Sequence, residues 1–289
     1  MTILHDPRCA EFGSDFRPER AARVRASAVH LRSAHADWKW REPGPVGEEA
    51  LLLAHTRAHL QRLQVPPGFD EDTPWYEDIF AHASRSVGGA LDAAHLALSG
   101  GGPAFSLMRP PGHHATAGQA MGFCYLNQVA VAAFAARAWG AARVAVWDFD
   151  AHHGNGTEAI LEGRPGFFLC SVHQFPGYPG TGTRNSPNCS NWPVPAHGSR
   201  LLHLEALERS WTAILAFRPE LILISAGFDA YLHDEVAPMS LEMDDFRTLG
   251  RWTAQAGIPA AAVLEGGYSE DLPLLMDAYL SAWQGDAAT

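Results

Sequence analysis

The chain has 289 residues, of which 47% are hydrophobic and 18% charged, and its formal net charge is −11. These values are typical of a globular protein with a large core, and we expect a single domain over residues 1–289. The acidic balance excludes sequence-independent binding of DNA or RNA, because such binding needs clustered Lys and Arg to neutralise phosphates.

The cysteines and the apolar segments predict a cytoplasmic protein without a membrane span. The four cysteines are widely spaced and include no C-x-x-C pair, so we expect neither a zinc ribbon nor a disulfide scaffold. The first residues lack the basic start and long apolar region of a signal peptide. The most apolar stretch, residues 129–147, is interrupted by Arg137, Gly140 and Arg143, which favours a helix, a turn and a strand.

Short apolar runs alternate with longer amphipathic or alanine-rich segments along the chain. The runs that predict strands lie near Ile3 and at residues 104–108, 144–147, 167–172, 221–225 and 261–264. The segments that predict helices span residues 18–35, 48–64, 74–99, 119–138, 201–217 and 241–256. Strands that alternate with helices predict an α/β fold with a doubly wound, mostly parallel sheet.

Two of the predicted strands end in potential metal ligands, where open α/β sheets bind their ligands. Asp148, Asp150 and His152 follow the third strand with a spacing of two, so in an extended chain they would project to one side. Asp229 follows the fifth strand after a small-residue turn. Asp150, His152 and Asp229 would suit a catalytic zinc, although iron(II), cobalt and manganese accept the same ligand types. Aspartates after strands also commonly cap turns.

Two further loops carry side chains suited to catalysis. Two prolines stiffen the approach to the tandem histidines His113 and His114, and a general base must be held within reach of its proton. Adjacent histidines also serve structural roles. After the last predicted strand, a glycine-rich turn places Tyr268 where its hydroxyl would stabilise an oxyanion or, alternatively, where its ring would simply pack.

Together these motifs resemble those of the zinc-dependent histone deacetylase family, which includes acetylpolyamine amidohydrolases. The matching segments follow one another in chain order, at residues 5–7, 17–20, 109–114, 122–127, 148–157, 225–229 and 265–268. The amino-acid sequences of these motifs are most similar to those of the class II and bacterial branch. The resemblance implies an arginase-like α/β fold in one domain.

The same resemblance implies a metal centre. Asp150, His152 and Asp229 would bind one Zn²⁺ per chain, and a water activated by the metal would attack an amide carbonyl. A structural K⁺ or Na⁺ site would be formed by a set that overlaps these ligands and adds two residues of the fourth predicted strand: Asp148, Asp150, His152, Ser171 and Val172.

By the same resemblance, His114 would act as general base and then protonate the leaving amine, while His113 would give electrostatic support. Asp148 would orient His113, as carboxylates do for catalytic histidines. Tyr268 would stabilise the oxyanion together with the metal. Asn155 stands where class I members have Asp, and a neutral partner favours an imidazolium less.

The substrate-binding positions also follow from the resemblance. Gly122, Phe123 and Tyr178 would form the walls of a narrow tunnel, although such residues also serve core packing. Asp72 would bind substrate at the rim, although acidic loops are often merely solvated. Val236 stands where polyamine-selective relatives carry a gatekeeping glutamate, which argues against a strict polyamine enzyme.

We therefore predict a metal-dependent hydrolase that removes acetyl or a related acyl group from an amine, whether acetyl-lysine, an acetylated polyamine or a small-molecule amide. A binuclear manganese ureohydrolase of the same fold would need additional bridging carboxylates and histidines. A non-catalytic acyl-amine binding protein would be expected to lack Tyr268 or a metal ligand, and none is missing. The sequence leaves the substrate and the oligomeric state open.

Overall fold

The computed structural model describes residues 1–285, so the last four residues of the predicted domain lie outside the described part. One eight-stranded sheet, with all neighbouring strands parallel, has the order β2-β1-β3-β8-β7-β4-β5-β6. This confirms the predicted parallel α/β fold. The strands are β1 (Thr2–Leu4), β2 (Lys39–Arg41), β3 (Ala104–Ser106), β4 (Val144–Asp148), β5 (Phe167–Gln174), β6 (Cys189–Val194), β7 (Leu221–Ala226) and β8 (Ala260–Leu264).

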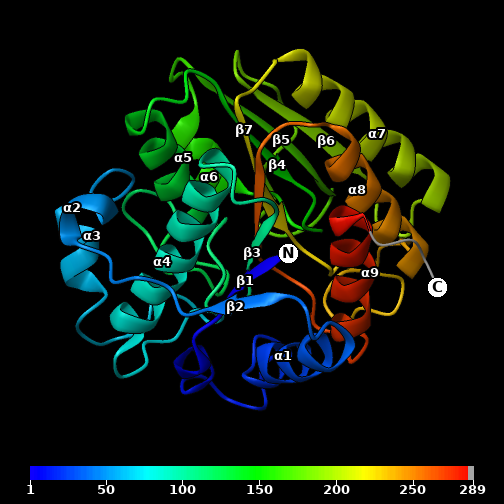
Figure 1. Ribbon diagram of the computed structural model, residues 1–289. Coiled ribbons are helices and arrows are strands. Elements are labelled where there is room, and N and C mark those ends of the chain that lie inside the picture. Colours follow the sequence, from blue (N-terminus) through cyan, green and yellow to red (C-terminus); the bar gives the residue numbers. More distant parts are fainter. Residues whose placement is uncertain (286–289) are drawn as a thin grey trace.

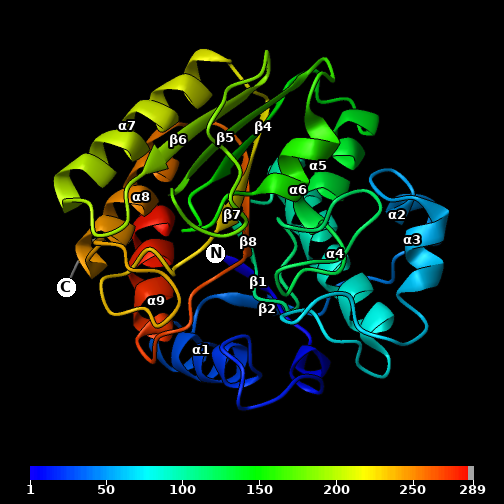
Figure 2. The ribbon, with the colours of Figure 1, turned by 180° about the vertical axis from the view of Figure 1, so that it is seen from behind.

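Helices cover both faces of the sheet. In Figure 1, α4, α5 and α6 lie on one side of the strands and α7, α8 and α9 on the other, with α1 next to α9; Figure 2 shows this arrangement from behind. The helices are α1 (Ala22–Ala34), α2 (Glu48–Leu51), α3 (Arg57–Arg62), α4 (Ile79–Leu98), α5 (Gln128–Ala138), α6 (Asn155–Leu161), α7 (Arg200–Ala216), α8 (Met243–Gln255) and α9 (Leu272–Gln284), with a 3₁₀ helix at Pro7–Ala10. None of the described helices has both the length and the apolar character that a bilayer span requires.

Strand β4 shows why the central strands have almost continuously apolar sequences. Val144 and Val146 belong to the hydrophobic cluster beneath α4 and α5, whereas Ala145 and Trp147 belong to the cluster beneath α7, α8 and α9. The indole of Trp147 is fully buried and donates a hydrogen bond of 2.9 Å to Ser210 Oγ on α7. Because successive side chains point to opposite faces, a strand covered on both sides needs apolar residues at every position.

Apart from the short 3₁₀ helix, four elements go beyond the sequence-based prediction: β2, β6, α6 and α9. β2 and β6 are the two edge strands of the sheet. β2 is short and exposes Lys39 and Arg41, and β6 contains Pro193, which an edge strand tolerates. Such strands pair on one side only, so their sequences carry little of the apolar pattern on which the prediction rests.

Two predicted helices are shorter than expected. The segment 48–64 is divided into α2 and α3, because Thr56 has an extended backbone and its hydroxyl caps α3 by accepting the backbone N–H of His59 at 3.2 Å. The segment 119–138 becomes helical only at Gln128, where Asn127 Oδ1 accepts the N–H of Ala130 at 2.9 Å. Residues 119–126 are thereby left as a loop.

Candidate active site

Four loops that follow four adjacent strands meet at one edge of the sheet. Residues 112–114 come after β3, residues 149–152 after β4, Asp229 after β7 and residues 265–268 after β8, and Asp148 is the last residue of β4. These strands are neighbours in the order β3-β8-β7-β4. Carboxyl ends of parallel strands share one edge, so segments far apart in sequence are brought together there.

The structure brings together the three predicted metal ligands. One ligand atom each from Asp150, His152 and Asp229 lies within 4.8 Å of the others. His152 Nδ1 is 2.9 Å from Asp229 Oδ2 and 3.2 Å from Asp150 Oδ1. Both carboxylates are buried, and apart from this contact with His152 no hydrogen bond from a described residue reaches Asp229 Oδ2. Two buried carboxylates that converge on one imidazole fit a divalent cation.

The backbone between these ligands differs from the predicted extended chain. β4 ends at Asp148, and two successive turns follow, in which Asp148 Oδ1 accepts the N–H of Asp150 at 3.1 Å and Asp150 Oδ1 accepts that of His152 at 2.9 Å. The aspartates therefore both cap turns and line the site. Gly266 packs against them so closely that a Cβ there would lie 2.6 Å from Asp150 Oδ2.

The tandem histidines lie next to this group and have different partners. Their ring centroids are 4.0 Å apart. His113 Nδ1 lies 3.0 Å from Asp148 Oδ2, and His114 Nδ1 lies 2.8 Å from Asn155 Oδ1. Asn155 Nδ2 points to Met121 Sδ at 3.5 Å, which is consistent with its oxygen facing the histidine.

The pKa values of the two histidines are consequently shifted in opposite directions. Burial lowers the pKa of His114 well below its usual range, and the neighbouring His113 and His152 lower it further. Burial also disfavours a charged His113, but Asp150 and Asp148 outweigh it and raise the pKa of His113 to about 10. These surroundings therefore favour a neutral imidazole at His114 beside a protonated one at His113.

The buried Glu265 connects the loop after β8 with the tandem histidines. Its Oε2 accepts the backbone N–H groups of Gly112 at 2.7 Å and His113 at 3.2 Å, and its Oε1 accepts the hydroxyl of Ser225 at 3.2 Å. Burial raises the pKa of Glu265 to about 7. The carboxyl group thus fixes the backbone of the histidine loop.

Tyr268 is held in the same region by its backbone neighbours and its ring. The Arg23 guanidinium donates to the carbonyl oxygens of Gly267 at 2.7 Å and Glu265 at 2.5 Å, and it lies 4.7 Å from the centroid of the Tyr268 ring. The Phe123 ring is 5.9 Å away. Burial raises the pKa of Tyr268 well above its usual range, so its hydroxyl stays protonated.

A pocket of about 180 Å³ opens onto these groups. Gly122 has a φ of +56°, and a Cβ there would lie 2.7 Å from His114 Cδ2. Phe123 also has a positive φ, and its N–H donates to Thr73 Oγ1 at 3.1 Å. The pocket is lined by all four predicted substrate-binding residues, by three of the predicted catalytic or metal residues, and by two others: Asp72, Gly122, Phe123, Tyr178, His114, His152, Tyr268, Gln174 and Val236.

The comparisons with known proteins agree with this arrangement. The family model described as histone deacetylase domain matches residues 16–282. The chain belongs to the histone deacetylase family. A histone deacetylase-like amidohydrolase of Pseudomonas aeruginosa is 36% identical over 88% of this chain and 72% of the relative. The acetylpolyamine amidohydrolase of Mycoplana ramosa is 37% identical over 83% of this chain and 76% of the relative.

Solved structures show the same relationship. The crystal structure of the HDA15 HD domain matches this chain with a TM-score of 0.92 at 29% identity. The match includes 100% of this chain and 90% of the HDA15 chain. The acetylpolyamine aminohydrolase of Burkholderia pseudomallei matches over the full length of both chains with a TM-score of 0.90 at 26% identity. These likenesses confirm the resemblance inferred from the motifs and place the chain among deacetylases and amidohydrolases.

Two residues of the predicted monovalent-ion site in this histone deacetylase family member, Ser171 and Val172, lie on β5, which pairs with β4. Ser171 is directly opposite Asp148 in the β4–β5 pairing, and both it and Val172 are buried. Ser171 Oγ is 2.9 Å from His173 Nδ1. Asp148 and Ser171 are thus direct neighbours in the sheet, while Asp150 and His152 lie in the turns that follow β4.

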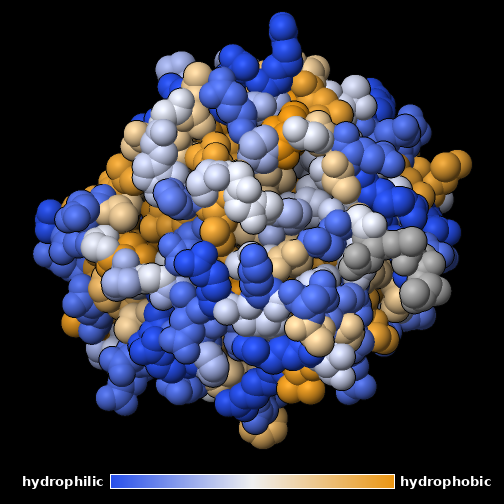
Figure 3. All heavy atoms as spheres, viewed as in Figure 1, coloured by the Kyte–Doolittle hydropathy of each residue, from blue (hydrophilic) through white to orange (hydrophobic). Residues whose placement is uncertain are grey.

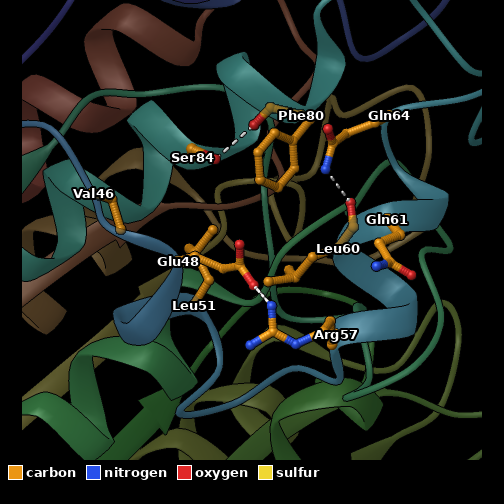
Figure 4. A pocket seen from close by; sticks show the side chains of 9 residues that line it. All are labelled: Val46, Glu48, Leu51, Arg57, Leu60, Gln61, Gln64, Phe80 and Ser84. Atoms are coloured by element: carbon orange, nitrogen blue, oxygen red, sulfur yellow. Dashed lines mark hydrogen bonds and ion pairs between the residues drawn. The ribbon is translucent and has the colours of Figure 1, made fainter.

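A second and larger hollow, of about 460 Å³, lies between α2, α3 and α4. Figure 4 shows three interactions among its lining residues: Glu48 with Arg57, Ser84 Oγ with the Phe80 carbonyl at 2.7 Å, and Gln64 Nε2 with the Leu60 carbonyl at 3.1 Å. No unsatisfied group among these points to a ligand. The hollow is lined by Val46, Glu48, Leu51, Arg57, Leu60, Gln61, Gln64, Phe80 and Ser84.

Sequence reasoning missed four residues that the structure adds to the deacetylase site. Gln174 lines the pocket, Glu265 and Arg23 hold the loops around it, and Asp234 binds the backbone at Tyr268. Glu265 directly follows a buried strand and precedes the glycine-rich turn, and this position in the sequence could have identified it as a residue of the site. Arg23 and Asp234 act on backbone atoms distant in sequence, which no local pattern reveals.

Proposed function

We propose that the chain is a zinc-dependent deacetylase that hydrolyses the amide bond of an acylated amine. One observation carries this proposal: the metal-ligand group, a neutral histidine and a buried tyrosine hydroxyl surround one pocket. Membership of the histone deacetylase family and relatives named acetylpolyamine amidohydrolase support acyl-amine hydrolysis.

Asp150, His152 and Asp229 would hold the metal. Their two carboxylates and one imidazole are ligands that zinc accepts while keeping a position open for water or substrate. When bound, Zn²⁺ supplies Lewis acidity that polarises the amide carbonyl and lowers the pKa of water. In the described residues, the other group of side chains that could hold an ion is His113, Cys124 and Glu265. Its one carboxylate, Glu265, accepts the backbone N–H groups of Gly112 and His113, so this group does not supply the several bridging carboxylates of a binuclear ureohydrolase.

His114 would be the general base. Asn155 Oδ1 can only accept, so the hydrogen bond of 2.8 Å places the proton on His114 Nδ1 and leaves Nε2 with its lone pair. The lowered pKa keeps this imidazole neutral at physiological pH. Nε2 would take a proton from the attacking water and then deliver it to the leaving amine nitrogen.

His113 and Tyr268 would stabilise the charge that develops on the substrate. His113, protonated between Asp148 and Asp150, places a positive charge beside the reacting carbonyl without transferring its proton. The Tyr268 hydroxyl would donate a hydrogen bond to the oxyanion. Because its phenol stays protonated, this donor is present at any physiological pH.

The pocket would bind the acyl group and an aliphatic stem between Gly122, Phe123 and Tyr178, with Asp72 at the rim. We assign a structural K⁺ or Na⁺ to Asp148, Asp150, His152, Ser171 and Val172, and a cytoplasmic location to the protein. The substrate class is an acylated amine, as the names of the relatives indicate.

The experiment is a competition assay of acetyl-lysine peptides against acetylputrescine, acetylcadaverine and acetylspermidine, with the zinc content measured alongside. We expect one zinc per chain. Tyr268→Phe should lower kcat by about 10²–10³, and His114→Ala by about 10²–10⁴. Tyr279→Phe on α9 and His95→Ala on the surface of α4 are matched controls that should retain activity. Two manganese ions per chain, or full activity in both site variants, would contradict the proposal.

A further inference from the structure

We propose that Asp234 is a positioning residue for Tyr268: its carboxylate anchors the backbone of Tyr268 and Ser269 and thereby fixes where the phenol points. The inference rests on the proposed function, because it assigns Asp234 a task in that reaction. Asp234 is not among the residues that line the pocket, so it would act through the residues whose backbone it binds, above all Tyr268.

The hydrogen bonds of Asp234 use both carboxylate oxygens. Oδ2 accepts the N–H of Tyr268 at 2.7 Å and that of Ser269 at 3.2 Å, while Oδ1 accepts the N–H of Val236 at 2.9 Å. One side chain from the loop after β7 is therefore bound to the loop after β8. Burial and the nearby Asp229 raise the pKa of Asp234 to about 7, whereas these three N–H donors favour its ionised form, in which the hydrogen bonds are charge-assisted and stronger than those between neutral groups.

The loop needs such an anchor because of its glycines. Gly267 has a φ of +116°, which L side chains rarely adopt, and it directly precedes Tyr268. On the other side of this glycine, Gly266 N–H donates to Asp150 Oδ2 at 2.7 Å. Arg23 binds the carbonyl groups of Glu265 and Gly267. The N–H groups that follow Gly267, those of Tyr268 and Ser269, are bound by the carboxylate of Asp234.

The same carboxylate also connects Tyr268 with the wall of the pocket. Val236 lines the pocket, and its backbone N–H donates to Asp234 Oδ1 in a turn that the two residues form. The phenol and this part of the wall are thus fixed by one group. An oxyanion donor contributes only when it lies about 2.7–3.1 Å from the developing charge, so a small displacement of Tyr268 weakens it.

The first test is Asp234→Ala measured against the wild-type enzyme with one acylated amine. We expect kcat to fall by about 10- to 100-fold, with KM changed much less, since Asp234 does not line the pocket. Asp234→Asn, which keeps one oxygen for Tyr268 and Ser269, should lose less. Asp92→Ala is a matched control, because Asp92 Oδ2 accepts the N–H of Gly44 at 2.8 Å away from the site; it should leave kcat unchanged.

A double-mutant cycle separates positioning from general loss of structure. If Asp234 acts through Tyr268, Asp234→Ala should have little further effect on kcat in a Tyr268→Phe background. Equal losses in both backgrounds, or a wild-type kcat in Asp234→Ala, would overturn the proposal.

Hydrogen exchange of the intact protein tests the anchor without reference to activity. Amides in residues 266–270 should exchange faster in Asp234→Ala than in the wild type, while those of β4 and β5 stay protected. Unchanged exchange at 266–270 would refute the anchor. If the wild-type protein hydrolyses no acylated amine, the proposed function fails, and the exchange result still decides whether Asp234 holds this loop.

Discussion

The carboxylates of Asp150 and Asp229 can occupy their positions because Gly266 has no side chain. A Cβ at this glycine would lie 2.6 Å from both Asp150 Oδ2 and Asp229 Cγ. Gly266→Ala should therefore displace both predicted ligands and weaken zinc binding by about 10- to 100-fold, measured by competition with a chelator. Gly118→Ala is the control, since nothing lies within 4 Å of a Cβ there. Equal zinc affinity in both variants would contradict this account of the site.

Val236 gives a second prediction at this scale, because it places an apolar side chain in the lining of the pocket. Val236→Glu should raise kcat/KM for acetylated polyamines relative to an acetyl-lysine peptide, since a carboxylate at the rim attracts the distal ammonium groups. An exposed pair of this kind contributes about 0.2–1 kcal/mol, so the shift should be a few-fold. Val236→Gln has a similar shape without charge and should show no such shift; an equal change in both variants would point to shape instead.

The residues of the site were predictable to different degrees. Asp150, Asp229 and Tyr268 each follow a short apolar run, so their side chains could be assigned to one edge of the sheet before the structure was known. The bends after Asp148 could not, because an alternating sequence fits both an extended strand and consecutive Asp-capped turns. Asp234 was missed because its partners are backbone N–H groups, which every residue except proline has.

Among the connections between elements, the buried pair of Glu19 and Arg109 joins the segment before α1 to the loop after β3. Arg109 is fully buried, and its Nε and Nη2 donate to Glu19 at 2.5 and 2.7 Å. Glu19→Gln would leave the guanidinium without its charge partner. We expect a loss of about 3–5 kcal/mol in the free energy of unfolding, measured by urea denaturation, with Glu48→Gln as the exposed control.

The same pair predicts a pH dependence of stability. Burial disfavours the charged Glu19, but Arg109 outweighs it, so the pKa of Glu19 lies below its ordinary value of 4.5. The unfolded chain therefore binds this proton first as the pH falls, and the contribution of Glu19 to stability is complete above pH 4.5 and decreases below it. Unfolding free energies measured across this range should decline less steeply in Glu19→Gln. Parallel curves would show that the pair does not titrate in this way.

The elements that were predicted correctly have an apolar pattern in their sequence, and two of the elements that were missed, β2 and α6, do not. β4 and β7 are buried on both faces and were evident from sequence. β2 exposes alternate residues at a sheet edge, and α6 begins within a glycine-rich segment, so neither has an apolar run of its own. Their formation depends on pairing and packing with elements that already carry the pattern.

Over the whole molecule, the charge distribution should influence how the substrate approaches. Acidic residues exceed Lys and Arg by 32 to 21, and Figure 3 shows hydrophilic side chains over much of one face. At the pocket rim, Asp72 is more than half exposed, and Arg17 lies 3.9 Å from it. An acidic molecule attracts cationic substrates through its long-range field, and salt screens that attraction.

Cationic and neutral substrates should therefore respond differently to salt. The value of kcat/KM for acetylspermidine should fall as the ionic strength is raised from about 0.02 to about 0.3 M, over which the screening length shortens to less than about 10 Å. A neutral acylated amine of similar length should show little change, because the field does not act on it. Arg17→Ala, which removes the positive charge beside Asp72, should raise kcat/KM for the cationic substrate at low salt. An equal salt response of both substrates would show that their approach is governed by the shape of the pocket and not by the net charge of the molecule.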